Sequence, residues 1–125
     1  MLLEIKDLRV HYETVEVLQG VSLKVDQGQI VSLIGANGAG KSTLLKTLSG
    51  LKKPTSGEIS FDGQRIEGRR PASIVRAGVA QVPEGGRVFT KMTVLENLRI
   101  GTTPRRDKQK IEADYELVYK HFPIL

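Results

Sequence analysis

The sequence of 125 residues contains no cysteine, only 5% aromatic residues and no apolar run near the ~20 residues that a membrane-spanning helix needs. Without cysteine, neither a disulfide framework nor a thiolate metal site can form. The opening segment Met1–Lys6 has too short an apolar stretch for a signal peptide. The scarcity of aromatic side chains leaves no evident stacking platform for single-stranded nucleic acid. We therefore expect a cytoplasmic protein.

The residues that are present are those of a soluble globular domain, with 39% hydrophobic and 26% charged residues. The formal net charge of +5 would suit nucleic acid, anionic lipid or a phosphate ligand. Basic residues are scattered, however, and form only small clusters at Arg69-Arg70 and Arg105–Lys108. We interpret these clusters as solvated surface rather than a nucleic-acid patch, and we expect no nucleic-acid partner.

Hydrophobic alternation predicts strands along much of the first half of the chain. The alternation from Leu3 to Tyr12 slips by one residue at Asp7, which indicates a bulge or the end of a strand. The nearly continuous apolar run Ile30–Ile34 is typical of a strand covered on both faces in a parallel sheet. Further strands are predicted in three segments: Val15–Val25 (one strand or two), Glu58–Asp62 and Val79–Val82.

Helices are predicted by apolar spacing and by their boundary residues. Thr93 and Glu96 form a capping box at the start of one of them. Another carries an apolar stripe that needs a surface to cover it. The predicted helices are Gly40–Ser49, Pro71–Ala77, Thr93–Ile100 and Lys108–Phe122.

The segment Gly35–Ser42 satisfies the phosphate-loop pattern G-x-x-x-x-G-K-[ST], and Thr43 follows. Glycine lets the backbone N–H groups turn inward as an anion nest, and the start of the next helix adds partial positive charge. Lys41 supplies a full charge to the β- and γ-phosphates, and the Ser42 hydroxyl suits Mg²⁺. The context, between a buried strand and a helix, favours this interpretation over an ordinary glycine turn. The expected nucleotide-binding residues are Asn37, Gly38, Ala39, Gly40, Lys41, Ser42 and Thr43.

Five motifs follow one another along the chain: Val21–Val25, Gly28–Ile34, Ala36–Thr43, Pro54–Ile59 and Met92–Leu98. Taken in this order, they resemble the ATP-binding subunits of ABC transporters over nearly the whole chain. The resemblance implies an α/β phosphate-loop NTPase fold of ABC type, in which antiparallel N-terminal strands precede the start of a parallel core sheet. It also implies that residues 1–125 are a partial ABC ATP-binding domain that ends before the Walker B strand, with ATP and Mg²⁺ as cofactors.

The segment Val82–Phe89 resembles branched-chain amino-acid importers of the LivF type, with Gly86 where arginine is more usual. Most ABC ATPases carry a glutamine whose oxygen reaches Mg²⁺, about thirteen residues along the chain before the asparagine of a Glu-Asn pair, and that pair is Glu96-Asn97 in this sequence. That position is occupied here by Glu84, whereas Gln81 lies in a predicted strand and is interpreted as structural. A carboxylate is a suitable Mg²⁺ ligand, so the resemblance makes Glu84 a metal ligand beside Ser42, with a solvent-exposed loop acid as the alternative. No residue is assigned a certain catalytic role.

The resemblance also implies that an aromatic residue at the end of the first strand stacks on adenine. That residue is Tyr12, with Val17 as an apolar neighbour of the base. The alternative is a tyrosine that covers the edge of the core. His11 and His121 have no partners that suggest catalysis or a metal, and we interpret both as surface or packing residues.

Members of the family continue with a Leu-Ser-Gly-Gly signature segment, a Walker B strand and a switch histidine, none of which occurs in this sequence. We therefore expect residues 1–125 alone to be unstable or oligomeric and not to hydrolyse ATP. The leading hypothesis is the ATPase subunit of an importer, peripheral on the cytoplasmic face of the inner membrane. Its expected partners are permease subunits, through Glu84–Leu98, and a second ATP-binding subunit in a head-to-tail dimer. Alternatives are another transport system, a truncated non-catalytic nucleotide-binding fragment and a basic nucleic-acid binder.

Overall fold

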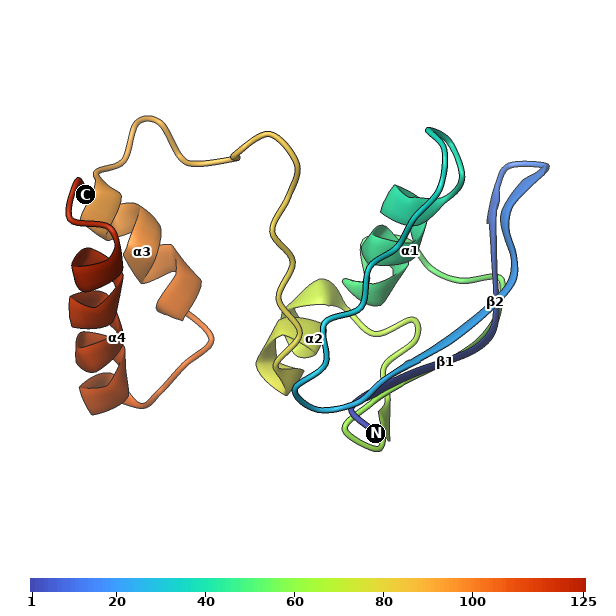
Figure 1. The fold of residues 1–125 in the computed structure, drawn as a ribbon, viewed down its shortest axis with the longest axis horizontal. Helices are drawn as coiled ribbons and strands as arrows, with labels where there is room; N and C mark the ends of the chain where they lie inside the picture. The colour runs from blue at the N-terminus through green and yellow to red at the C-terminus, as the bar shows by residue number, and fades with distance from the viewer. The chain divides into compact units, whose positions relative to one another are not determined.

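The computed structural model describes residues 1–125 and divides them into two compact units, Met1–Gln81 and Val82–Leu125 (Figure 1). The first unit combines strands with two helices, whereas the second contains helices only. The elements of the first unit are β1 (Leu3–Tyr12), β2 (Val15–Val25), α1 (Lys41–Leu48), β3 (Ser56–Phe61), β4 (Gln64–Arg65) and α2 (Pro71–Ala77). Those of the second are α3 (Val94–Thr102) and α4 (Lys108–His121).

The four strands form one antiparallel sheet in the order β2-β1-β3-β4. The central strand β1 pairs Leu3 with Val25 on one side and with Phe61 on the other. The register shifts between Ile5 and Leu8, where Asp7 has a positive φ of 44° and its N–H donates to Ser22 Oγ at 2.9 Å. The interruption predicted at Asp7 is therefore confirmed as a bulge within a continuous strand.

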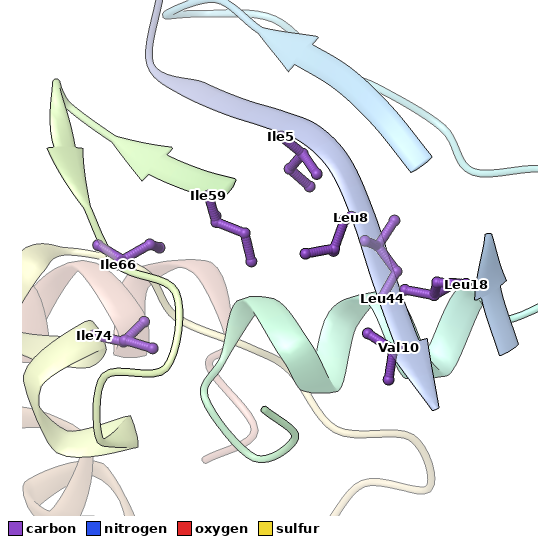
Figure 2. Close-up of a cluster of buried hydrophobic side chains, with 8 residues drawn as sticks. All are labelled: Ile5, Leu8, Val10, Leu18, Leu44, Ile59, Ile66 and Ile74. Atoms are coloured by element: carbon purple, nitrogen blue, oxygen red, sulfur yellow. The ribbon is translucent and has the colours of Figure 1, made fainter. Parts of the chain in front are cut away.

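The core of the first unit consists of eight aliphatic side chains that are at most 3% exposed. Figure 2 shows that they come from the strands, from the segment after β4 and from both helices. They are Ile5, Leu8, Val10, Leu18, Leu44, Ile59, Ile66 and Ile74. Burial of each side chain stabilises the fold by about 1.5–3 kcal/mol before the entropy cost of ordering it. Leu44 packs against this core from α1 (Figure 2), so the same contacts fix the helix that follows the phosphate loop.

Two predicted strands do not form, and this part of the prediction is wrong for the structure. Ile30–Ile34 and Val79–Val82 lie outside the sheet, and all pairing in the sheet is antiparallel. Ile30 and Ile34 are 97% and 96% exposed, and Val82 is 93% exposed. A strand requires hydrogen-bonded neighbours, and no segment of residues 1–125 pairs with these two. The parallel part of the sheet that the apolar composition predicted is therefore not formed in residues 1–125.

The helical predictions are confirmed in all four places, with boundaries that differ by at most a few residues. In α1, Gly50 follows the helix with a φ of 77°, and α2 begins at Pro71 and ends before Gly78, which has a φ of 108°. Only glycine adopts such positive φ values without strain, which is why it marks helix ends. In α3, the capping box joins Thr93 and Glu96 as predicted.

In the second unit, α3 and α4 are neighbours (Figure 1), joined by a hydrogen bond between Thr102 Oγ1 and Tyr115 Oη at 3.2 Å. Arg105, in the connection, forms ion pairs with Asp107 and Asp114. In the apolar stripe predicted on α4, the side chains of Ile111, Tyr115 and Val118 are each half-buried. Phe122, which follows the helix, is 58% exposed. None of the helices in the structure combines the length and apolar content that a bilayer crossing requires.

Candidate functional site

The phosphate loop leads directly into α1, whose N-cap is Gly40. The first intrahelical bond runs from Leu44 N–H to Gly40 O at 2.9 Å, so the N–H groups of the preceding turn have no intrahelical acceptor. No side chain caps this end of the helix. These free donors and the positive end of the helix dipole make the start of α1 suited to an anion.

Glycine at position 40 is required by both conformation and space. Its φ is 90°, and a Cβ there would lie 2.7 Å from Leu18 Cδ2 and 3.2 Å from Val17 O. Gly38 has a similar φ of 85° but faces open space. The loop is thus held closely against β2 at Gly40, while Gly38 supplies only a left-handed turn.

The Lys41 side chain bends back across the loop. Its ammonium donates to the carbonyl oxygens of Gly35 at 2.6 Å and of Ala36 at 2.7 Å. The loop is also closed by Ala39 N–H, which donates to Ala36 O at 3.2 Å. Neutral carbonyl groups are weaker partners for an ammonium than phosphate oxygens, so a phosphate at the loop would compete with them for Lys41.

The two hydroxyl residues after Lys41 occupy different environments. Ser42 is exposed, whereas Thr43 is only 9% exposed. Thr47 Oγ1 donates to Thr43 O at 2.8 Å inside the core, which fixes the first turn of α1. The backbone N–H groups, an ammonium and an exposed hydroxyl together form a donor set that fits a polyphosphate with its magnesium ion.

The predicted base-binding residues lie on the hairpin next to the loop. Tyr12 ends β1, pairs with Val15 across the turn and is 40% exposed. Val17 is half-buried on β2, and its Cγ1 lies 3.5 Å from the position of a Cβ on Gly40. The structure therefore brings Val17 against the phosphate loop. Sequence reasoning missed Lys52, whose ammonium lies 4.1 Å from the centroid of the Tyr12 ring.

Glu84 is exposed and belongs to the second unit, whereas Ser42 belongs to the first. No group of three or more His, Asp or Glu residues in the structure could hold a metal ion by itself. Mg²⁺ is commonly bound through one or two protein ligands together with substrate phosphates. The absence of a three-residue group therefore does not test the role of Ser42 and Glu84 as metal ligands, which stays a prediction. Gln81 is also exposed, and it ends the first unit.

Asn97 organises the segment that follows Glu84. Its Oδ1 accepts from Phe89 N–H at 2.8 Å, and its Nδ2 donates to Phe89 O at 3.1 Å, to Thr93 O at 2.9 Å and to Met92 O at 3.3 Å. The sequence identifies Glu96-Asn97 only as a motif of the family. The hydrogen-bond partners of Asn97 are backbone groups, which do not depend on residue type, so the sequence does not predict them. The Asn97 side chain holds this turn in place while Phe89 remains 57% exposed.

Comparison with known proteins identifies the family to which this chain belongs. Residues 18–124 match the family profile described as ABC transporter. The match covers most of the chain, and the resemblance inferred from the phosphate loop and the later motifs is confirmed. The chain belongs to the ABC transporter family.

Two curated relatives illustrate the range of similar proteins. The chain is 42% identical over 124 residues to the high-affinity branched-chain amino acid transport ATP-binding protein BraG of Pseudomonas aeruginosa, covering 99% of this chain and 53% of BraG. It is 39% identical over 105 residues to the ribose import ATP-binding protein RbsA 1 of Rubrobacter xylanophilus, covering 84% of this chain and 21% of the relative. This chain thus spans about half of BraG and about a fifth of RbsA 1.

A solved ATP binding subunit of an ABC transporter superposes on 83% of this chain with a TM-score of 0.74 and 40% sequence identity. The superposition covers 42% of that subunit. The ABC-type phosphate-loop fold expected from the sequence is therefore confirmed, although its parallel strands are not formed in residues 1–125.

Proposed function

We propose that residues 1–125 are the N-terminal part of an ABC ATP-binding domain and that their phosphate loop binds MgATP. The observation that carries this proposal is the start of α1, where the N–H groups of the first turn have no intrahelical acceptor, Lys41 lies across the loop and Ser42 is exposed. An ordinary glycine turn needs neither the G-x-x-x-x-G-K-[ST] spacing nor a lysine folded across it.

In this proposal each site residue has a separate role. The backbone from Asn37 to Thr43 surrounds the phosphates, Lys41 contacts the β- and γ-phosphates, and Ser42 binds Mg²⁺. Tyr12 stacks on adenine beside Val17. Glu84 contributes a carboxylate oxygen to the metal, directly or through water. Bound Mg²⁺ would neutralise charge on the β- and γ-phosphates, and the residues of this chain would hold and orient the nucleotide.

The proposed biological role is ATP-driven import of branched-chain amino acids. It is supported by the similarity to BraG over 99% of this chain. The similarity to RbsA 1 keeps another transport system, such as a sugar importer, as the alternative. The proposed partners are permease subunits, contacted through Glu84–Leu98, and a second ATP-binding subunit. Peripheral attachment to the cytoplasmic face of the inner membrane follows from this assembly.

ATP hydrolysis is proposed for the complete protein and not for residues 1–125 alone. Hydrolysis also requires a group that orients the attacking water, and the roles proposed for Lys41, Ser42 and Glu84 concern the phosphates and the metal only. The exposed apolar side chains of Ile30, Ile34 and Val82 also favour association when these residues stand alone. A monodisperse residue 1–125 fragment with ATP turnover that requires Lys41 would overturn this part of the proposal.

Titration calorimetry with MgATP on the protein as encoded by its gene tests nucleotide binding. Lys41→Ala removes the charge at the phosphates and should weaken binding about ten- to a hundredfold. Lys46→Ala is the matched control, because it removes an exposed lysine from the last turn of the same helix. Equal affinities for wild type and Lys41→Ala would refute the proposal.

A further inference from the structure

The segment after α1 brings one lysine onto the face of the predicted base-stacking residue. Lys52 Nζ lies 4.1 Å from the centroid of the Tyr12 ring. Lys52 is half-buried, while its neighbour Lys53 is exposed. A lysine can bury its aliphatic stem against the protein while its ammonium stays accessible, and here Lys52 is partly covered whereas Lys53 is not.

The backbone on both sides of Lys52 is fixed. The N–H groups of Leu51 and Lys52 donate to Lys46 O at 2.8 and 3.1 Å, which anchors the segment to the end of α1. Three residues later, Thr55 N–H donates to Arg9 O at 2.8 Å. Thr55 Oγ1 also lies 3.0 Å from His11 Nδ1, next to Tyr12 in the chain. Hydrogen bonds at and after Lys52 along the chain therefore fix its backbone beside the end of β1, where Tyr12 lies.

The two faces of the Tyr12 ring are consequently unequal. A cation within about 6 Å of a ring centroid is attracted to the negative face of the π system, so one face is already covered by the ammonium. Tyr12 nevertheless remains 40% exposed. Lys52 arrives from the segment that precedes β3, whereas the phosphate loop adjoins the opposite neighbour of β1, strand β2, at Gly40.

We propose that Lys52 is a positioning residue for the nucleotide base: it holds the Tyr12 ring from one face so that the other face stacks on adenine. The inference rests on the proposed nucleotide-binding function. A ring fixed before binding loses less conformational freedom when the base arrives, and this saving appears as affinity. Lys52 in this role touches Tyr12 and not the phosphates, which separates its effect from that of Lys41.

The test compares the affinity of the encoded protein for MgATP with its affinity for tripolyphosphate, a probe without a base. Lys52→Met keeps an unbranched stem, one atom shorter, but removes the charge, and it should weaken ATP binding about two- to fivefold while leaving tripolyphosphate binding unchanged. Lys52→Arg should restore ATP affinity, because a guanidinium also binds an aromatic face. Lys53→Met controls for the loss of one positive charge and should bind both ligands like wild type.

A double-mutant cycle with Tyr12→Leu tests whether Lys52 acts through the ring. In the Tyr12→Leu background, Lys52→Met should have no further effect on ATP affinity. An unchanged or tighter affinity for ATP in Lys52→Met alone would overturn the inference, and the tighter value would show that the lysine competes with the base. Equal losses for ATP and tripolyphosphate would overturn it in favour of a general charge effect.

The same experiment separates failure of this inference from failure of the proposed function. If wild type does not bind ATP, or binds it independently of Lys41, the proposed function itself is refuted. If Lys41→Ala and Tyr12→Leu both weaken ATP binding while Lys52→Met does not, only the role of Lys52 is refuted.

Discussion

Substitution of Gly40 by alanine should destabilise the first unit far more than the same substitution at Gly38. Both residues have left-handed φ values, 90° and 85°, so both variants incur the conformational cost of about 1–2 kcal/mol for a side chain in that region. Only at position 40 would the new Cβ clash, at 2.7 Å from Leu18 Cδ2 and 3.2 Å from Val17 O. Leu18 is 3% exposed and cannot move aside without disturbing the core. Overpacking of this kind adds about 1–3 kcal/mol.

We therefore expect Gly40→Ala to lower the free energy of unfolding by roughly 2–5 kcal/mol and Gly38→Ala by about 1–2 kcal/mol. Urea unfolding of the encoded protein, followed by circular dichroism, measures both values against wild type. The pair is matched in residue type and backbone conformation and differs only in the space around the added methyl group. Equal losses for the two variants would show that the loop is not held against β2 as described.

Two further predictions concern the second unit. Asn97→Ala removes the hydrogen bonds to Phe89 and Thr93 and should cost about 1–3 kcal/mol. Hydrogen exchange at Phe89 should accelerate in that variant, and unchanged protection would contradict the role of the amide. The two hydrogen bonds from the Arg105 guanidinium hold the pKa of Asp107 at about 2, below its ordinary value of 3.8. Because folding lowers this pKa, ionised Asp107 stabilises the fold at pH values above its pKa in the unfolded chain. That stabilisation is lost as the pH falls from about 4 towards 2. In an NMR titration, the Asp107 midpoint should rise towards 3.8 in Arg105→Gln, and an unchanged midpoint would refute the pairing.

Local signals in the sequence predicted most of the helices and turns. The capping box at Thr93 and the proline at the start of α2 act within a few residues of themselves, so their effect does not depend on the rest of the fold. The slip at Asp7 was likewise visible as a change in alternation phase. The phosphate loop could be placed for the same reason, because the apolar run, the glycines, the lysine and the helix start are contiguous in the chain.

Interactions between distant segments were not predictable in this way. Ile30–Ile34 has the composition of a buried strand, but a strand forms only with a neighbour to pair with, and composition does not supply one. Lys52 and Tyr12 meet because the chain returns from α1 to the start of β3, which no local pattern encodes. The acceptors of Asn97 are backbone carbonyl groups, which every residue type carries, so the sequence does not indicate which residues supply them.

The central claim is that the phosphate loop binds a nucleotide, and the backbone N–H resonances of the loop report on it directly. In the isotopically labelled protein, addition of MgATP should shift the N–H signals of Gly38–Thr43 more than those of α2 or α4, since these donors face the proposed phosphates. Saturation of those shifts with increasing MgATP, and their loss in Lys41→Ala, is the result we expect. Loop signals that stay unmoved at saturating MgATP, or that move no more than those of α4, would contradict the claim.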